Sequence, residues 1–270
     1  MIVGLASALA TDQAAFGNKA ANLAVALQAG LPVPEGVAIS VTATSGEIER
    51  QVRTGLARIS GPYAVRSSST VEDSVDKSYA GMFVTILGVT AISEVPRSVQ
   101  RVRDSARTML VKRYSGHESD VPIGVIVQRQ IAAQSAGVAF TRHPVTGHEE
   151  VVVEASFGLG KYVVDGCVTP DSFVIDTATG KTQSHNSLKR RRLDYIAGEL
   201  VERDLAGDEQ SQESITIDQA MRIRNLAISV EALFGWPADL EWAYDETGRL
   251  WLLQARPITG LPSKPMERTT

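Results

Sequence analysis

Residues 239–256 read DLEWAYDETGRLWLLQAR, and this stretch decides the fold of the region around it. Apolar and polar residues alternate on both sides of a polar segment that contains glycine, a pattern typical of an antiparallel hairpin. With the turn centred just before that glycine, Glu241 lies opposite Gln254 and Asp239 lies opposite Arg256. Residues two apart in a strand share a face, so we expect all four side chains on one patch of sheet.

Two carboxylates, an amide oxygen and a guanidinium on one patch suit the binding of a metal-bound polyphosphate. Carboxylate and amide oxygens are hard ligands suited to Mg²⁺, and a guanidinium binds phosphate oxygens through two N–H groups at once. The same residues also fit the solvent-facing side of an amphipathic hairpin, and their spacing supports the two interpretations equally. The mixture of acidic, amide and cationic side chains, in place of threonine and lysine, favours a functional patch.

The residues before this hairpin predict further strands and one well-delimited helix. The helix is expected over 217–234, because Thr216 and Gln219 form a capping box and Gly235 ends the amphipathic pattern. The nearly continuous apolar run at 123–131 predicts a buried central strand. Further strands are expected at 137–141, 150–154 and 173–176.

The first part of the chain also mixes the two element types, which predicts a mixed α/β (α+β) fold class. The expected helices cover roughly 18–30, 46–59 and 91–115, and the expected strands cover 37–40, 63–66 and 80–89. We expect an N-terminal lobe over 1–117, a C-terminal lobe over 118–262 and a frayed tail over 263–270.

Two cationic residues of the first lobe lie where an anion can bind. Lys19 follows Gly17–Asn18 at a predicted helix start, where free backbone N–H groups attract anions. Arg66 ends a predicted strand and precedes three serines, whose N–H and O–H groups can donate to phosphate oxygens. Gly81, near the start of another strand, would let the backbone approach a phosphate closely. Each feature alone is weak, because most single lysines and arginines are surface charges.

Composition argues against several classes of protein. The 270 residues carry a net charge of -4 with a pI near 5.7, which gives no reason to expect a nucleic acid or an anionic membrane as partner. The single cysteine, Cys167, has no partner for a disulfide within the chain and suits a reducing, cytoplasmic location. No apolar run approaches the ~20 residues of a membrane span. The four histidines lack metal-ligand spacing, and the basic run Lys189–Arg192 is expected to be a solvated loop.

The glycine and serine motifs argue against two common nucleotide-binding folds and one hydrolase fold. Gly158-Leu-Gly160 lacks the spacing of a dinucleotide fingerprint and has no P-loop lysine. No Gly-x-Ser-x-Gly segment marks a nucleophilic serine. The motifs therefore reject a Rossmann dehydrogenase and a Walker-type ATPase.

Eight ordered motifs run through nearly the whole chain. They are Gly17–Leu23, Leu31–Gly36, Ala64–Asp73, Tyr79–Met82, Gly137–Gly147, Glu154–Gly160, Val168–Asp171 and the hairpin strands Asp239–Trp242 with Leu252–Pro257. Together they resemble the ATP-binding domain of the phosphoenolpyruvate synthase, pyruvate phosphate dikinase and rifampicin phosphotransferase family. Because the motifs occur in the family order, the match is highly specific.

The resemblance implies an ATP-grasp fold in which ATP binds between two lobes, with Mg²⁺ as a further cofactor. It implies that Lys19 and Arg66 hold the ATP phosphates and that Arg256 joins them in catalysis. The residues that it implies for the metal and the phosphates are Asp239, Glu241 and Gln254.

The resemblance also implies residues around the base and over the phosphates. The strand Val125–Ile131 looks like the adenine hinge, whose backbone reads the edge of the base. The cofactor-binding residues implied there are Gln128, Arg129 and Ile131, and those implied in the phosphate-covering loop are Gly81 and Met82.

Three features depart from the family pattern. Val84 precedes Thr85 where the family usually has an acidic residue, and Lys161 follows the Gly-Leu-Gly segment where it usually has glutamate. The segment between Ser40 and Tyr63 is shorter than usual. These differences bear on the geometry of phosphate transfer and on the acceptor.

Family enzymes relay phosphate through a histidine on a separate swivelling domain and then to an acceptor in a third domain. None of the four histidines here has the Thr/Ser-rich context of that histidine, and the chain ends soon after Pro257. Met1 and the polar tail fit a complete short chain, and an excised domain is the alternative. The predicted function is an ATP-dependent phosphotransferase that acts on a small molecule or on a histidine of a separate phosphohistidine-domain protein.

Two other classes of function stay open. An ATP-grasp ligase would join a carboxylate to an amine through an acyl phosphate. A regulatory module would keep the nucleotide pocket without transfer, and the intact set of Lys19, Arg66, Glu241 and Gln254 argues against that class. The sequence gives no indication of the oligomeric state.

Overall fold

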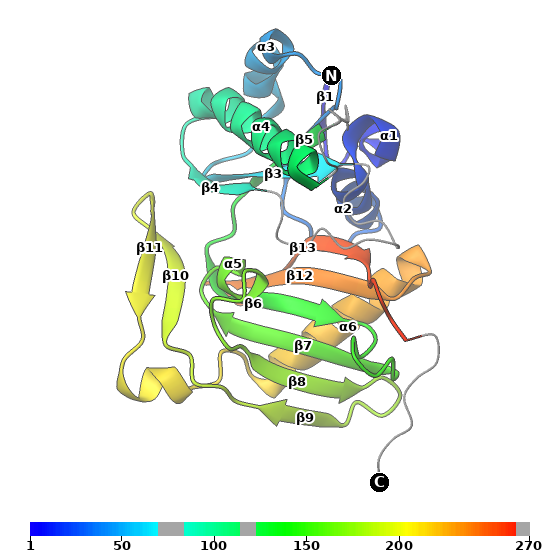
Figure 1. The fold of residues 1–270 in the computed structure, drawn as a ribbon, viewed down its shortest axis with the longest axis vertical. Coiled ribbons are helices and arrows are strands. Elements are labelled where there is room, and N and C mark those ends of the chain that lie inside the picture. The colour runs from blue at the N-terminus through cyan, green and yellow to red at the C-terminus, as the bar shows by residue number, and fades with distance from the viewer. Residues whose placement is uncertain (70–83, 114–122, 263–270) are drawn as a thin grey trace. The chain divides into compact units, whose positions relative to one another are not determined.

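The computed structural model describes residues 1–69, 84–113 and 123–262 (Figure 1). The chain divides into two compact units. The first unit is Met1–Ile131 with Ala197–Leu200, and the second is Ala132–Ile196 with Val201–Thr270. Both units contain helices and sheets, so the predicted mixed α/β class is confirmed.

A five-stranded antiparallel sheet forms the centre of the first unit, in the order β1-β2-β5-β3-β4. Its strands are β1 (Ile2–Gly4), β2 (Gly36–Ile39), β3 (Tyr63–Ser69), β4 (Thr85–Val89) and β5 (Ile123–Arg129). The helices of this unit are η1 (Ala8–Thr11), α1 (Gln13–Phe16), α2 (Asn18–Gln28), α3 (Ser45–Gly55), η2 (Ile92–Glu94) and α4 (Val95–Arg113).

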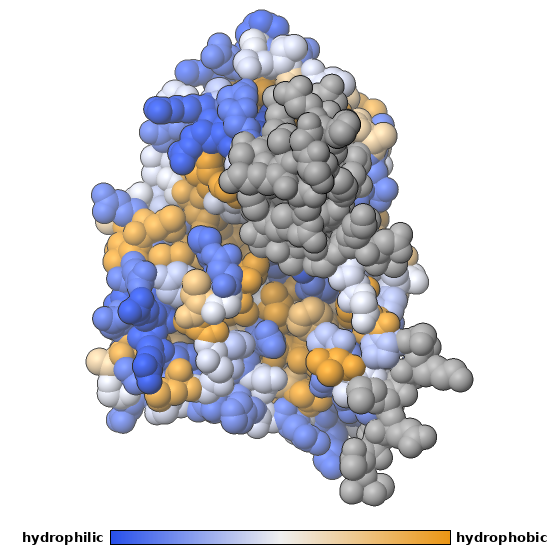
Figure 2. Space-filling view, viewed as in Figure 1, coloured by the Kyte–Doolittle hydropathy of each residue, from blue (hydrophilic) through white to orange (hydrophobic). Residues whose placement is uncertain are grey.

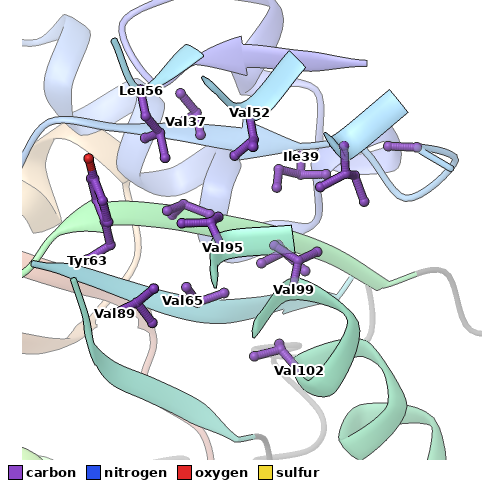
Figure 3. Packing of buried hydrophobic residues seen from close by; sticks show 14 residues of the cluster. Val37, Ile39, Val52, Leu56, Tyr63, Val65, Val89, Val95, Val99 and Val102 are labelled. Atoms are coloured by element: carbon purple, nitrogen blue, oxygen red, sulfur yellow. The ribbon is translucent and has the colours of Figure 1, made fainter. Parts of the chain in front are cut away.

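One face of this sheet encloses a hydrophobic core together with α3 and α4 (Figure 3). Alternate residues of the strands point into this core, as expected when one face of a sheet is buried. Helix α3 begins at a capping box formed by Thr44 and Glu47, which fixes where it starts. The core residues include Val37, Ile39, Tyr63, Val65, Val89, Val125 and Val127 of the strands and Ile48, Val52, Leu56, Val95, Val99 and Val102 of the helices.

Helix α2 packs on the opposite face of the sheet, which carries Ser68 and Gly124. A Cβ atom at Gly17 would lie 2.1 Å from the carbonyl oxygen of Ser68, and one at Gly124 would lie 2.4 Å from that of Phe16. Only glycine therefore fits at either position without a shift of the backbone. The N–H of Ala20 donates to Ser68 Oγ over 2.9 Å, which fixes the first turn of α2 beside β3.

Strand β5 corrects the expected boundary between the lobes. The sequence pattern assigns residues 118–131 to the C-terminal lobe, whereas β5 pairs with β2 on one side and with β3 on the other. An apolar run identifies a strand that is buried on both faces, but it does not identify the sheet to which the strand belongs. The division falls after Ile131 instead of after residue 117.

The second unit contains a six-stranded antiparallel sheet, in the order β13-β12-β6-β7-β8-β9, and a separate hairpin of β10 and β11. The strands of the sheet are β6 (Ala133–Phe140), β7 (Glu150–Phe157), β8 (Asp171–Asp176), β9 (Thr182–His185), β12 (Ala238–Asp245) and β13 (Leu250–Pro257). The other elements are α5 (Lys161–Val164), β10 (Arg191–Ile196), β11 (Glu199–Asp204), η3 (Gly207–Ser211) and α6 (Ile217–Phe234).

Helix α6 packs on one face of the six-stranded sheet (Figure 1). Its limits confirm the prediction, because Thr216 and Gln219 form the capping box and Gly235 adopts a left-handed cap with φ 75°. The hydroxyl of Tyr244 donates to the carbonyl oxygen of Gln219 over 3.0 Å, so this face of β12 is the one turned to α6. Across the described residues, no helix combines the length and the apolar character that a bilayer crossing requires.

The prediction that the basic run Lys189–Arg192 is a solvated loop is wrong for Lys189, whereas Arg190 and Arg191 are exposed. Lys189 is fully buried, and its Nζ donates to Asp171 Oδ1 over 2.5 Å and to two nearby oxygen atoms. The other carboxylate oxygen of Asp171 accepts hydrogen bonds from the N–H and the hydroxyl of Ser214. All three ammonium protons have acceptors, which is the condition under which a buried ion pair persists. Arg191 already belongs to β10.

We expect Gly17→Ala to destabilise the chain more than Gly30→Ala does. Both glycines have positive φ angles, of 82° and 83°. Only Gly17 has neighbours within 4 Å of the added Cβ, so the substitution there adds a clash to a backbone cost of about 1–3 kcal/mol. Thermal unfolding of both variants measures the difference, and equal losses of stability would contradict the close packing of α2 on β3.

Candidate functional site

The hairpin of β12 and β13 places four polar side chains on one face of the second sheet. Asp239 pairs with Arg256 and Glu241 pairs with Gln254, which confirms the predicted pairs. Cross-strand partners share a face, and alternate residues of one strand do so as well. Tyr244 has the opposite parity in β12 and turns to α6, so the four polar side chains point away from that helix.

A β-bulge makes this arrangement possible. The register shifts between Glu241 and Trp242, which leaves Leu253 as the extra residue of β13. Without it, the register set beside the turn would place Gln254 opposite Leu240, on the buried face that packs against α6. A slip of one residue moves every side chain of a strand to the other face. The predicted pairs are therefore right because of the bulge, which the sequence prediction does not contain.

Asp239 and Arg256 form an ion pair on this face. Nε and Nη2 of Arg256 both donate to Oδ2 of Asp239, over 2.8 and 2.6 Å. The side chain of Arg256 is only 19% exposed and that of Asp239 only 11%, so water competes weakly for the hydrogen bonds between them. The carboxylate thus holds the guanidinium in one orientation on the sheet face.

A third carboxylate, Glu154, lies on the same face. Val138 of β6 pairs with Glu241 on one side and with Glu154 of β7 on the other, so the three residues form one row across the sheet. Burial raises the pKa of Glu154 above its usual value of 4.5. One of the sequence motifs contains Glu154, but the sequence analysis gives it no role. The alternation of β7 is the signal that would have placed it on this face.

Partly exposed apolar residues lie between these acids. Phe140 pairs with Asp239 and with Val152, and Val138 lies two residues away from it on the same strand face. Apolar contact area beside a few oriented polar groups is typical of sites that bind ring-containing ligands. The face can therefore contact both an apolar ring and a charged group.

The oxygen atoms on this face suit a Mg²⁺ ion that shares its ligands with phosphate and water. Among the described residues, no group of three or more His, Cys, Asp or Glu side chains is positioned to hold a metal ion by itself. Mg²⁺ usually takes one or two carboxylates and completes its shell with water and substrate phosphates. The carboxylate of Glu241 and the amide oxygen of Gln254 are opposite each other and supply that kind of ligand.

Lys19 and Arg66 lie in one region of the first unit. Lys19 is in the first turn of α2, and Arg66 shares a face of β3 with Ser68, against which that turn packs. Their exposed fractions are 5% and 9%, which is unusual for charged side chains and excludes the interpretation that they are ordinary surface charges.

The start of α2 has fewer available N–H groups than the sequence suggests. The N–H of Ala20 donates to Ser68 Oγ over 2.9 Å, and that of the N-cap residue Gly17 donates to the carbonyl oxygen of Gln13 over 2.8 Å. An anion near this helix start would therefore depend on the Lys19 and Arg66 side chains more than on the helix terminus.

The residues expected in the adenine hinge lie at the end of β5 and just after it. The N–H groups of Arg129 and Gln130 donate to backbone carbonyls over 2.9 and 2.8 Å, and the side-chain amide of Gln128 donates to the Pro34 carbonyl over 3.1 Å. These three groups therefore already have hydrogen-bond acceptors within the first unit. Within the described part of the chain, the N–H of Ile131 has no backbone partner.

Two of the expected nucleotide-binding residues, Gly81 and Met82, lie outside the described residues. Of the departures from the family pattern, Lys161 forms an ion pair with Asp165, the residue that caps the C-terminal end of α5. The lysine that stands in place of the usual glutamate is thus paired within its own short helix.

The family model for the pyruvate phosphate dikinase AMP/ATP-binding domain matches residues 42–270. The chain belongs to this family. The match confirms the resemblance to the family and covers six of the eight sequence motifs, and it supplies ATP as the nucleotide of the domain.

Curated relatives are much longer than this chain. A probable phosphoenolpyruvate synthase of Archaeoglobus fulgidus is 35% identical over 76% of this chain and 28% of its own length. A rifampicin phosphotransferase of a Streptomyces species is 36% identical over 93% of this chain and 28% of its own length. The prodigiosin synthesizing transferase PigC of Serratia marcescens is 31% identical over 99% of this chain and 34% of its own length. The chain therefore spans between about a quarter and a third of these relatives.

Solved structures give a more distant likeness. The VanG D-Ala:D-Ser ligase of Enterococcus faecalis covers 97% of this chain and 57% of its own length at 15% identity, with a TM-score of 0.46.

The raised pKa of Glu154 predicts a dependence of stability on pH. Because its pKa is higher in the folded chain than in the unfolded chain, the protonated form stabilises the fold below about pH 4.5, and this contribution is lost as the pH rises through the folded value. Glu154→Gln should therefore melt at a higher temperature than the parent chain at pH 7 and at a similar temperature at pH 4. The exposed Glu199→Gln serves as control, and a difference between parent and Glu154→Gln that does not change with pH would contradict the assignment.

Proposed function

We propose that the chain binds ATP with Mg²⁺ and acts as the nucleotide-binding part of an ATP-dependent phosphotransferase. The observation that carries the proposal is the sheet face on which Glu241 and Gln254 lie opposite each other beside the Asp239–Arg256 pair. Membership of an AMP/ATP-binding family supports ATP as the nucleotide.

The proposed roles follow the chemistry of each side chain. Glu241 and Gln254 would hold Mg²⁺, which would neutralise negative charge on the phosphates. Asp239 already carries the guanidinium through Oδ2, so its proposed role shifts from metal ligand to support for Arg256. Arg256 would donate N–H groups to phosphate oxygens.

In the first unit, Lys19 and Arg66 are proposed to neutralise the ATP phosphates. Phosphoryl transfer needs little covalent chemistry from the protein, and most of the catalysis comes from positioning and charge neutralisation. Buried cations suit this task, because an electrostatic interaction is stronger where water is excluded. Of the hinge residues Gln128, Arg129 and Ile131, the backbone N–H of Ile131 is proposed to read the adenine edge.

The acceptor of the phosphoryl group is proposed to lie outside these residues. The relatives are named for different products, among them rifampicin phosphotransferase and phosphoenolpyruvate synthase, and the chain matches only a part of each. A shared ATP-binding part combined with variable acceptors accounts for that variety. The acceptor is a small molecule or a histidine on a separate phosphohistidine domain.

We expect Glu241→Gln to weaken the Mg²⁺-dependent part of ATP binding by at least about tenfold, because the change removes a charged metal ligand and keeps the shape of the side chain. Calorimetric titration of ATP with and without Mg²⁺ measures this part directly. The affinity for metal-free ATP should change much less.

Glu246→Gln is the matched control, since Glu246 is an exposed carboxylate in the turn of the same hairpin. It should bind Mg·ATP like the parent chain. If Glu241→Gln kept the full effect of Mg²⁺ while its thermal unfolding was unchanged, Glu241 would not be a metal ligand. If the parent chain bound no ATP at all, the proposed function would be wrong.

A further inference from the structure

A groove of about 520 Å³ lies between α3 and the η2–α4 segment of the first unit. Its volume is in the range of small-molecule sites. All its walls come from one unit, so its shape depends only on the packing of α3 against α4. The lining residues are Ser45, Ile48, Glu49, Val52, Arg53, Ile92, Ser93, Pro96, Arg97 and Gln100.

The floor of the groove is apolar. Ile48 and Val52 of α3 belong to the hydrophobic core, and Figure 3 shows Val52 on the side of α3 that faces α4. Ile92 and Pro96 are only partly buried, so apolar surface stays accessible between the two helices. A ligand with an apolar body would remove this surface from water.

The rim of the groove is polar and carries an excess of positive charge. Arg53 and Arg97 are exposed and come from opposite walls, and the one acidic residue of the lining is Glu49. In the part of the chain that the structure describes, neither arginine has a hydrogen bond or an ion pair. Figure 2 shows predominantly hydrophilic side chains around α3, at the top of the view. Two unpaired guanidinium groups are suited to bind a carboxylate or a phosphate.

The groove is separate from the cations assigned to ATP. Residues of β3 alternate between faces, so Val65 points into the core under α3 and α4 while Arg66 points to the α2 side. The groove lies on the Val65 side of the sheet and Lys19 lies on the other.

We propose that this groove is a second ligand site, which takes a small organic anion with an apolar body, such as an aromatic carboxylate or phosphomonoester. The body lies on Ile92 and Pro96, and the anionic group binds Arg53 and Arg97 across the groove. At such a site, a compound other than ATP would bind to the first unit.

Phenyl phosphate is the probe, followed through the backbone ¹H–¹⁵N signals of the whole chain. We expect saturable shifts at residues of α3 and at the start of α4, and binding at least about tenfold weaker for inorganic phosphate and for benzyl alcohol, because each has only half of the recognised chemistry. Shifts spread over the surface without saturation, or equal affinity for inorganic phosphate, would overturn the proposal.

The double variant Arg53→Ala/Arg97→Ala should lose the binding by at least about tenfold. Arg50→Ala/Arg101→Ala is the matched control, because it removes one exposed arginine from each of the same two helices without changing the groove lining. The control should bind phenyl phosphate like the parent chain. An equal loss of affinity in the two variants would mean that net charge alone determines binding, and it would overturn the proposal.

Saturation with Mg²⁺ and a non-hydrolysable ATP analogue should leave the phenyl phosphate shifts in place. Displacement of the probe from α3 and α4 by the analogue would show that the groove is a nucleotide site, and would contradict a separate ligand class. Because this test reads the groove directly, its result is independent of whether the proposed phosphotransferase function is right.

Discussion

One extra residue in β13 determines which side chains the candidate site contains. The bulge at Leu253 turns Gln254 and Arg256 to the face that carries Asp239 and Glu241, and it leaves the neighbouring leucines on the buried face. If the bulge were absent, an amide and a guanidinium would enter an apolar core beneath α6, which is costly without partners. Burial of the other face against α6 therefore stabilises the register on which the polar patch depends.

In the first unit, close backbone packing determines where the side chains of the candidate site lie. Glycine at positions 17 and 124 lets the chain before α2 approach β3 and β5, and this contact brings the turn that carries Lys19 next to the strand that carries Arg66. Burying two cations in one region costs free energy unless anions or dipoles compensate. Two buried cations in one region suit the proposed binding of the ATP phosphates.

Local signals in the sequence predicted local features well. The limits of α6 were predictable because Thr216, Gln219 and Gly235 act within one or two turns, and the existence of the β12–β13 hairpin was predictable because a short turn joins the strands. Its exact pairs depend on the bulge at Leu253, which the sequence pattern does not reveal. The sheet that contains β5 and the burial of Lys189 were not predictable, since both depend on contacts between segments far apart in the chain. The face on which Glu154 lies was predictable in principle from alternation in β7. Its place in one row with Glu241 could be known only from the order of three strands in the sheet.

The most direct test of the account is where a bound metal lies. Mn²⁺ takes the oxygen ligands that Mg²⁺ takes and broadens nearby backbone signals in nuclear magnetic resonance spectra. With a non-hydrolysable ATP analogue present, the account predicts that the signals of Glu241, Gln254 and their neighbours on β12 and β13 broaden first. Within the second unit, the signals of β9, at the opposite edge of the same sheet, should broaden last. Broadening that spares β12 and β13, or that needs no nucleotide and centres elsewhere, would contradict the claim that the bulged hairpin holds the metal.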